Sequence, residues 1–374
     1  MDLLFPYPLG APRPVDPATI ERGLAQLWED PTLQADAESP VVRACTLNFA
    51  VVLSADDSGQ DVTDAVAALT IRHPCRAFLL TVEPQAPAPA LAASVAALCH
   101  LLGGHQHICC EQVAIMAKGD AVAGLQHLLL SLLVPDLPLV VWWRGGAPLG
   151  TPLFEQLNAI ADRVVIDGAA SADGAVDVPR VAALLEQRRA PALTDLAWSR
   201  LTRWRTLAAQ FFDAPGQRAF LDRLDRIVVE VRADVTAAEA LLWLGWLASR
   251  LGWTARSGRR DPQRCVYTFD AGRAIDAEVR RYAGDAPHVL HRITLMASSA
   301  PPVRFTLERC DGDAARASAE TPDLGRQSRV VPMEVRDTAA LLSDELDLMG
   351  RDHMYEEALA VAGRLARLLN GARP

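Results

Sequence analysis

A strand, a helix and a second strand follow one another in residues 41 to 83, and this order constrains the fold more than any other feature. The stretch VVRACTLNFAVVLS (41–54) is β-rich, GQDVTDAVAALTIRH (59–73) is helix-like, and CRAFLLTVE (75–83) is again typical of a strand. Two strands joined through a helix pair in parallel, by a right-handed crossover. The sequence therefore begins with an α/β arrangement.

The rest of the first half extends this sheet. Two strands flank the glycine-rich loop GGHQ (103–106) and should pair in antiparallel fashion. A helix over 121–135 ends at a proline, and PLVVWW (138–143) is apolar and short enough for a buried strand. We therefore expect residues 1–190 to form an N-terminal α/β domain, with a mixed, mostly parallel sheet flanked by helices.

The second half has a different order of elements. A long helix over 195–213, a strand over 226–232 and a strongly apolar helix over 236–253 come first. Four strand-like runs then follow without helices between them, and two amphipathic helices end the chain. Strands in series favour an antiparallel sheet, so we expect residues 191–374 to form a C-terminal α+β domain. The length of 374 residues fits two domains.

Charge and composition exclude several classes of function. The net charge is −9, and no run of lysine or arginine offers a footprint for nucleic acid. No apolar segment approaches the length of a membrane span, and the start MDLLFPYPLG lacks a basic leader, so we expect a cytoplasmic protein. The seven cysteines lack the spacing of a disulfide scaffold, which predicts mostly reduced thiols.

Motifs for catalysis and cofactor binding are missing from the sequence. There is no Gly-x-Gly-x-x-Gly or Gly-x4-Gly-Lys-Ser/Thr loop, no Gly-x-Ser-x-Gly elbow and no His-Glu-x-x-His helix. The nearest approach to a phosphate loop is RGGAPLG (144–150), which lacks the lysine and the spacing. We therefore predict a protein without catalysis, cofactor or metal. The alternative is a sugar-phosphate or nucleotide-binding enzyme that uses the glycine-rich turn after Arg144.

Histidines and cysteines gather on the two strands around GGHQ. A four-residue loop there would pair Cys99 with Cys110 and His100 with Cys109. Because side chains alternate along a strand, Cys99 and Cys110 would share one face as a redox-active pair. His100, His107 and Cys109 would share the other face as three metal ligands. Plain packing of reduced cysteines is the interpretation that the sequence favours over both.

Tryptophans and basic residues at the ends of elements are the candidates for partner binding. Trp142 and Trp143 should point to opposite faces of the sheet, which favours core packing. Alternatively, with Arg144 they form a contact edge where a parallel strand ends. His73 and Arg76 flank a proline, where solvated charges at a helix end are the favoured interpretation and a polar contact is the other.

The helix over 195–213 offers a further candidate surface. Its apolar residues form one stripe at helical spacing, and Arg203 and Arg205 lie mostly off that stripe. Such a helix usually packs domains together, and a basic partner-binding flank is the second interpretation.

Four blocks together resemble the OpcA family, the bacterial glucose-6-phosphate dehydrogenase assembly proteins. They are HPCR (73–76), LLVPDLPLVVWWRG (132–145), DLAWSRLTRWRTLAAQFFD (195–213) and GWLASRLGW (245–253), in that order. The resemblance implies a non-catalytic partner that promotes assembly of glucose-6-phosphate dehydrogenase and modulates its activity allosterically. For such a partner we expect the Trp142-Trp143-Arg144 edge to help shape the surface that meets the dehydrogenase. His73, Arg76, Arg203 and Arg205 are our further candidates for contact residues.

Overall fold

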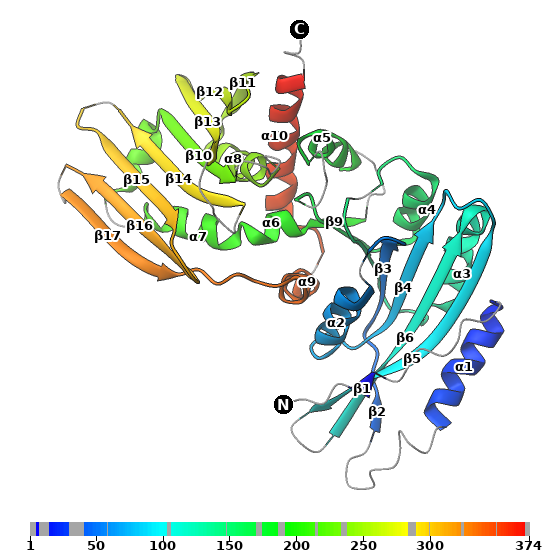
Figure 1. The fold of residues 1–374 in the computed structure, drawn as a ribbon. Helices are drawn as coiled ribbons and strands as arrows, with labels where there is room; N and C mark the ends of the chain where they lie inside the picture. The colour runs from blue at the N-terminus through cyan, green and yellow to red at the C-terminus, as the bar shows by residue number, and fades with distance from the viewer. Residues whose placement is uncertain are drawn as a thin grey trace. The chain divides into compact units, whose positions relative to one another are not determined.

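The computed structural model contains two β-sheets, each with its own helices (Figure 1). The residues that it describes are 5–6, 15–29, 41–57, 59–102, 106–146, 148–169, 174–185, 191–213, 216–232, 238–282, 289–298, 300–322, 325–348 and 350–370. The α/β class expected from the sequence is confirmed, with a largely parallel first sheet and a largely antiparallel second one.

The chain divides into two compact units that exchange segments along the sequence. Unit 1 comprises residues 1–167, 189–194 and 338–351, and unit 2 comprises 168–188, 195–337 and 352–374. A single boundary near residue 190 therefore does not describe this partition. The reason is long-range packing: helix α5 (Gly174–Leu184) lies against the C-terminal helix α10 (His353–Asn370), which brings a segment of the first half into unit 2.

The sheet of the first unit has its hairpin at one side and its parallel strands at the centre. Its order is β1-β5-β6-β4-β3-β7-β8-β9, with β2 paired to β6. Only β5 with β6 and β1 with β5 are antiparallel among the pairs whose register is resolved. The strands are β1 (Phe5–Pro6), β2 (Val41–Arg43), β3 (Leu47–Ser54), β4 (Cys75–Glu83), β5 (Ala90–Leu102), β6 (Gln106–Lys118), β7 (Leu139–Trp143), β8 (Arg163–Ile166) and β9 (Ala192–Asp195).

Helices cover both faces of this sheet, which explains why its central strands are largely apolar and buried. Helices α2 and α9 pack together, and α1, α3 and α4 form a second group (Figure 1). All residues of β3 except the last are buried, as expected for a parallel strand between two helical layers. The helices are α1 (Pro17–Glu29), α2 (Gly59–Thr70), η1 (Gly119–Gly124), α3 (Leu125–Leu132), α4 (Pro152–Ile160) and α9 (Thr338–Asp347).

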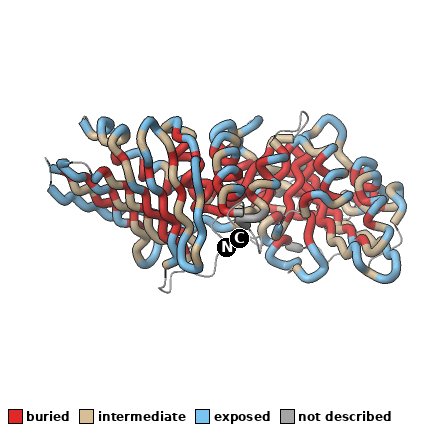
Figure 2. Tube along the Cα trace, turned by 90° about the horizontal axis from the view of Figure 1, so that it is seen from above, coloured by how far each residue is buried: buried red, intermediate tan, exposed pale blue. Residues whose placement is uncertain are grey.

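The second sheet follows the order β11-β12-β13-β10-β14-β15-β16-β17, and all its neighbours are antiparallel except β10 with β13. One face packs on helices and the other is polar, so buried residues recur along strands such as β14 and β15 between residues that are mostly intermediate in burial (Figure 2). Its strands are β10 (Arg226–Arg232), β11 (Thr254–Arg260), β12 (Arg264–Asp270), β13 (Ala274–Tyr282), β14 (Leu290–Ala297), β15 (Val303–Arg309), β16 (Ala314–Thr321) and β17 (Gly325–Pro332).

The helices of the second unit differ from the sequence expectation in two places. The predicted helix over 195–213 is two helices, α6 (Leu196–Arg200) and α7 (Thr202–Gln210), with a break at the buried Leu201. Helix α5 overlaps the stretch GAASADGAVDVP (168–179), whose composition is low in structure-forming residues and predicts no element. Close packing on α10 stabilises α5, since a Cβ on Gly363 would lie 2.8 Å from Ala182. The remaining helices are η2 (Arg218–Arg223) and α8 (Ala238–Leu251).

Candidate functional site

The two tryptophans at the end of β7 belong to the core. Trp142 is 3% exposed and stacks near Phe49 on β3, and Trp143 is 2% exposed and packs on Phe154 of α4. They point to opposite faces, as the alternation predicts. Neither indole ring is therefore available to touch a partner directly. Of the proposed contact edge, only Arg144 keeps exposed surface.

Arg144 lies at the carboxyl end of the parallel strands and faces two acids. Its Nε is 3.5 Å from Asp57 Oδ1, and its Nη2 is 3.7 Å from Asp61 Oδ2, in the first turn of α2. About a quarter of the Arg144 side chain is exposed. In α/β sheets this is where a helix N-terminus binds phosphate, but two carboxylates there repel an anion. The geometry thus disfavours the nucleotide-binding alternative.

Arg76 is the centre of a buried charge network, and its interpretation as a solvated residue is wrong. It is 5% exposed. Its Nε donates to Glu111 Oε2 at 2.7 Å, and its Nη1 donates to Glu21 on α1 at 2.7 Å and to the Leu132 carbonyl at 2.6 Å. Glu111 in turn accepts from Trp28 Nε1 at 2.8 Å. The network connects α1 and the end of α3 to the sheet, so the contacts of Arg76 hold the fold of unit 1 together.

His73 connects the end of α2 to α9. Its Nε2 lies 3.0 Å from Ser343 Oγ and 3.6 Å from Asp347 Oδ1, and only 12% of its side chain is exposed. Burial lowers the pKa of the imidazole from its ordinary value, and this outweighs the opposing effect of Asp347. The arrangement favours a neutral histidine that holds two helices together.

The arginines of α7 differ in their surroundings. Arg203 is exposed and its Nε donates to the Pro332 carbonyl at 3.2 Å. Arg205 lies over the Trp198 ring, 3.4 Å from its centroid, and donates to the Trp198 carbonyl at 2.8 Å. Trp198 is buried and its Nε1 donates to Asp352 at 2.8 Å. Arg205 therefore helps to hold α6 and α7, whereas Arg203 keeps exposed surface.

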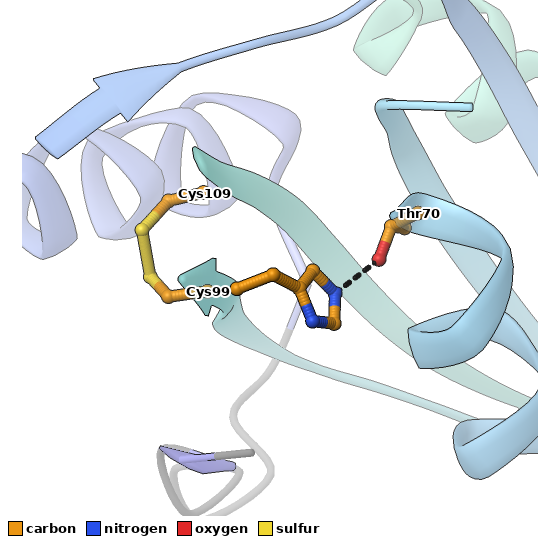
Figure 3. Close-up of a disulfide and its surroundings, with 4 residues drawn as sticks. Thr70, Cys99 and Cys109 are labelled. Carbon is orange, nitrogen blue, oxygen red and sulfur yellow. Dashed lines mark hydrogen bonds between the residues drawn. A yellow bond between two sulfur atoms is a disulfide. The ribbon is translucent and has the colours of Figure 1, made fainter. Parts of the chain in front are cut away.

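The β5–β6 hairpin pairs its cysteines one residue away from the expected register. Cys99 lies opposite Cys109, and the two form a disulfide (Figure 3). The predicted Cys99–Cys110 pair is therefore wrong, and Cys110 is a free, buried thiol. The cause is the loop length: β5 ends at Leu102 and β6 begins at Gln106, which leaves three residues between the strands where four were expected.

The same shift separates His100 from Cys109, two of the three residues that the alternative metal site would need. His100 now lies opposite Ile108, on the other face of the hairpin from Cys109. The His100 Nε2 lies 2.6 Å from Thr70 Oγ1, the contact drawn in Figure 3. The side chain of His107 lies outside the described residues. Within the described ranges, no group of three or more His, Cys, Asp or Glu side chains could hold a metal ion.

The free thiols next to the hairpin are poorly reactive. Burial raises the pKa of Cys110 to about 11 and that of Cys75 well above its ordinary value. Thiols that stay protonated near neutral pH are weak nucleophiles and weak metal ligands. Cys110 and Cys75 are therefore core residues. Plain packing of reduced cysteines describes Cys110 but is wrong for Cys99 and Cys109, which form a disulfide.

One group of candidate functional residues was not predicted from the sequence. Six arginines line an open hollow on the polar face of the second sheet, at Arg226, Arg280, Arg292, Arg304, Arg316 and Arg326. They lie far apart in the sequence and meet only through strand pairing. The signal that could have found them is the alternation of charged and apolar residues in runs such as VRFTLE (303–308).

No helix in the described part of the chain is long and apolar enough to cross a membrane.

Family models match both halves of the chain. One described as the N-terminal domain of a glucose-6-phosphate dehydrogenase subunit matches residues 66–183. A second, described as the C-terminal domain of a glucose-6-phosphate dehydrogenase subunit, matches residues 191–359.

Similar proteins carry a name that agrees with these models. A putative OxPP cycle protein OpcA from Synechocystis is 28% identical over 329 residues, covering 84% of this chain and 68% of the relative. Another from Synechococcus elongatus is 30% identical over 328 residues, covering 81% and 71%. An NAD binding oxidoreductase from Klebsiella pneumoniae has a TM-score of 0.50 at 12% identity, with 88% and 97% covered, a likeness of fold alone. With models matching both halves and relatives of one name, the chain belongs to the OpcA family of glucose-6-phosphate dehydrogenase assembly proteins.

Proposed function

We propose that this chain is a non-catalytic partner of glucose-6-phosphate dehydrogenase, which promotes assembly of that enzyme and modulates its activity allosterically. The observation that carries the proposal is the match of two dehydrogenase-subunit models across both halves of the chain. The relatives named for the OxPP cycle support the same pathway.

The mechanism that we propose is differential binding. A partner shifts an enzyme between states only as far as it binds one state better than another. The chain would therefore contact the active oligomer or conformation of the dehydrogenase more favourably than its other forms. In unit 1, Arg144 remains the exposed member of the edge proposed from the sequence, with Arg203 as a further exposed candidate in unit 2.

The chemistry at the carboxyl end of the first sheet supports a partner role over the enzyme alternative. Asp57 and Asp61 stand where a phosphate group would need backbone N–H donors, and they surround the guanidinium of Arg144. The rival function would require the isolated chain to bind a sugar phosphate or nucleotide tightly, or to turn it over, without the dehydrogenase.

The test is a titration of the purified chain into dehydrogenase from the same organism. NADP reduction is followed across glucose-6-phosphate concentrations while mass photometry reports the assembly state. A saturable change in activity with a mixed complex supports the proposal. No complex and no change, with the disulfide either oxidised or reduced, refutes it.

Contact through the edge is tested with Arg144→Ala alone. The double change that includes Trp143→Ala is a poor probe, because removing a buried tryptophan costs about 3–5 kcal/mol of stability. Unchanged affinity of a folded Arg144→Ala variant for the dehydrogenase would remove Arg144 from the proposed contact.

A further inference from the structure

The polar face of the second sheet carries a ladder of alternating charges. One row of directly opposed residues runs across five neighbouring strands, and every second member is an arginine. In order from β13 to β16, the row is Arg280, Glu230, Arg292, Glu308 and Arg316. A second, shorter row pairs Arg304, Glu320 and Arg326 on β15, β16 and β17. We call these residues, with Arg226 and Glu278, the arginine face.

Two glutamates of the arginine face, Glu230 and Glu278, lie beneath the arginines. Only 8% of the Glu230 side chain is exposed, while the arginines of the face are between 34% and 71% exposed. Glu230 Oε1 accepts from Arg280 Nε at 2.8 Å, and its Oε2 accepts from Arg292 Nη1 at 2.9 Å. Glu230 therefore holds the guanidinium groups of Arg280 and Arg292 in place. The pairs of Arg304 and Arg326 with Glu320, and of Arg316 with Glu308, are longer ion pairs of 3.5–4.0 Å.

An open hollow of about 570 Å³ lies over this face, lined by the six arginines together with threonine, serine and two glutamates. The opposite face of the sheet is the apolar one, with residues such as Phe305 and Leu307 buried against the helices of unit 2. Among the described residues of unit 2, the helices pack on the apolar face, and the arginine face is the more exposed side of the sheet.

The charge of the arginine face is opposite to that of the whole chain. Its six arginines outnumber the four glutamates Glu230, Glu278, Glu308 and Glu320, whereas the protein has a net charge of −9. A second copy of the chain would bring one positive face against another, which costs free energy. An acidic surface would instead find preordered guanidinium donors, which bind carboxylates by paired hydrogen bonds.

The dimensions favour a protein surface over a small anion or a continuous polyanion. Four strand spacings of ~4.8 Å place Arg280 about 19 Å from Arg316, which is wide enough for a patch of a protein interface. A phosphate chain crossing the row would meet a carboxylate at every second position. A protein surface can place its own acids opposite the arginines and avoid the glutamates.

We propose that the arginine face is a docking surface for an acidic protein surface, and that on the proposed function this surface belongs to glucose-6-phosphate dehydrogenase. Electrostatic complementarity of this kind raises the association rate and weakens as salt screens the charges. Binding should therefore depend on Arg304, Arg316 and Arg326, the exposed arginines of the arginine face on β15, β16 and β17.

The test compares two variants of the full chain that lose the same charge. The face variant is Arg304→Gln, Arg316→Gln and Arg326→Gln. The control is Arg218→Gln, Arg364→Gln and Arg367→Gln, at exposed positions on η2 and α10, outside the arginine face. Circular dichroism and thermal unfolding establish that each is folded, since half-exposed ion pairs contribute little stability. Affinity for the purified dehydrogenase is measured by biolayer interferometry at two salt concentrations.

We expect the face variant to bind about tenfold or more weakly, to lose most of the salt dependence, and to associate more slowly, while the control stays within about twofold of the unmodified chain. A variant with lysine at the same three positions keeps the charge and should recover part of the affinity. Equal binding by the face variant and the unmodified chain overturns the docking surface and leaves the proposed function standing.

Two other results would overturn the inference in different ways. If the unmodified chain does not bind the dehydrogenase, the proposed function is refuted, and the assignment of the arginine face to that enzyme is refuted with it. If the arginine face instead supports a self-dimer in mass photometry, or binding of a short single-stranded DNA, and the face variant abolishes it, the occupant is a second copy or a polyanion.

Discussion

Replacing Arg76 with methionine should destabilise unit 1 severely, although the side chain touches no proposed partner surface. The arginine is 6% exposed, its Glu111 partner 4%, and it donates three hydrogen bonds of 2.6–2.7 Å. Removing one partner of a buried pair costs about 3–5 kcal/mol when the other charge is left uncompensated. Glu111 keeps the half-exposed Arg43, whose Nη2 lies 2.6 Å from Glu111 Oε1, so we expect a cost near the lower end of that range, about 3 kcal/mol. Folded proteins have about 5–15 kcal/mol of stability, so this loss is a large share.

The matched control is Arg72→Met. Arg72 also donates to a carboxylate at 2.7 Å, that of Asp347, but 61% of its side chain is exposed. Solvent screening limits such a pair to about 1 kcal/mol or less. Urea unfolding followed by tryptophan fluorescence measures both variants, and hydrogen exchange in α1 reports whether the loss is local to the Arg76 network.

A double-mutant cycle isolates the pair itself. The variant with methionine at both Arg76 and Glu111 should cost less than the two single variants added together, because it leaves no buried charge without its main partner. If Arg76→Met costs no more than Arg72→Met, or if the two single costs add without coupling, the reasoning about the buried network is refuted.

Three shorter predictions concern packing, thiol chemistry and pH. Gly245→Ala on α8 should cost about 1–3 kcal/mol in urea unfolding, because its Cβ would collide with the backbone of α10; a neutral effect would contradict that close packing. Mass spectrometry of the alkylated native chain should recover the Cys99–Cys109 disulfide, and a Cys99–Cys110 link would disprove the register. Cys110 should be labelled slowly, since its pKa is raised to about 11. Burial lowers the pKa of His73 in the folded chain. Its contribution to stability is therefore present above the ordinary pKa of about 6.5 and is lost as the pH falls through the folded pKa. His73→Asn should flatten the fall of the unfolding midpoint between about pH 7 and pH 5, and an unchanged slope would contradict this.

Local sequence patterns predicted most of the helices and strands. They failed where packing against a distant segment determines whether a helix forms or where it ends. The βαβ order over 41–83 and the strand run after residue 260 are confirmed because hydrophobic periodicity is a property of neighbouring residues. Helix α5 was not expected, because its stability depends on packing against α10, which lies about half the chain away in sequence. The break at Leu201 was also not expected, since both sides of it have helical composition.

The candidate site shows the same division at the level of single residues. Alternation predicted that Trp142 and Trp143 point to opposite faces, which the structure confirms. The hairpin register differed by one residue, because a loop of three or four residues cannot be told apart from the sequence GGHQ. That single residue decides which cysteine bonds to Cys99.

The sequence by itself determined the α/β class, the succession of two kinds of sheet and the resemblance to the OpcA family, because each depends on residues that are neighbours or blocks along the chain. The tertiary structure alone decided that Arg76 is buried, that Cys99 pairs with Cys109, and that arginines from six strands gather on one face. Burial and charge clustering arise when distant segments pack together. A local alternation such as that of VRFTLE (303–308) indicates that one strand has a charged face, but only strand pairing decides which charged residues meet.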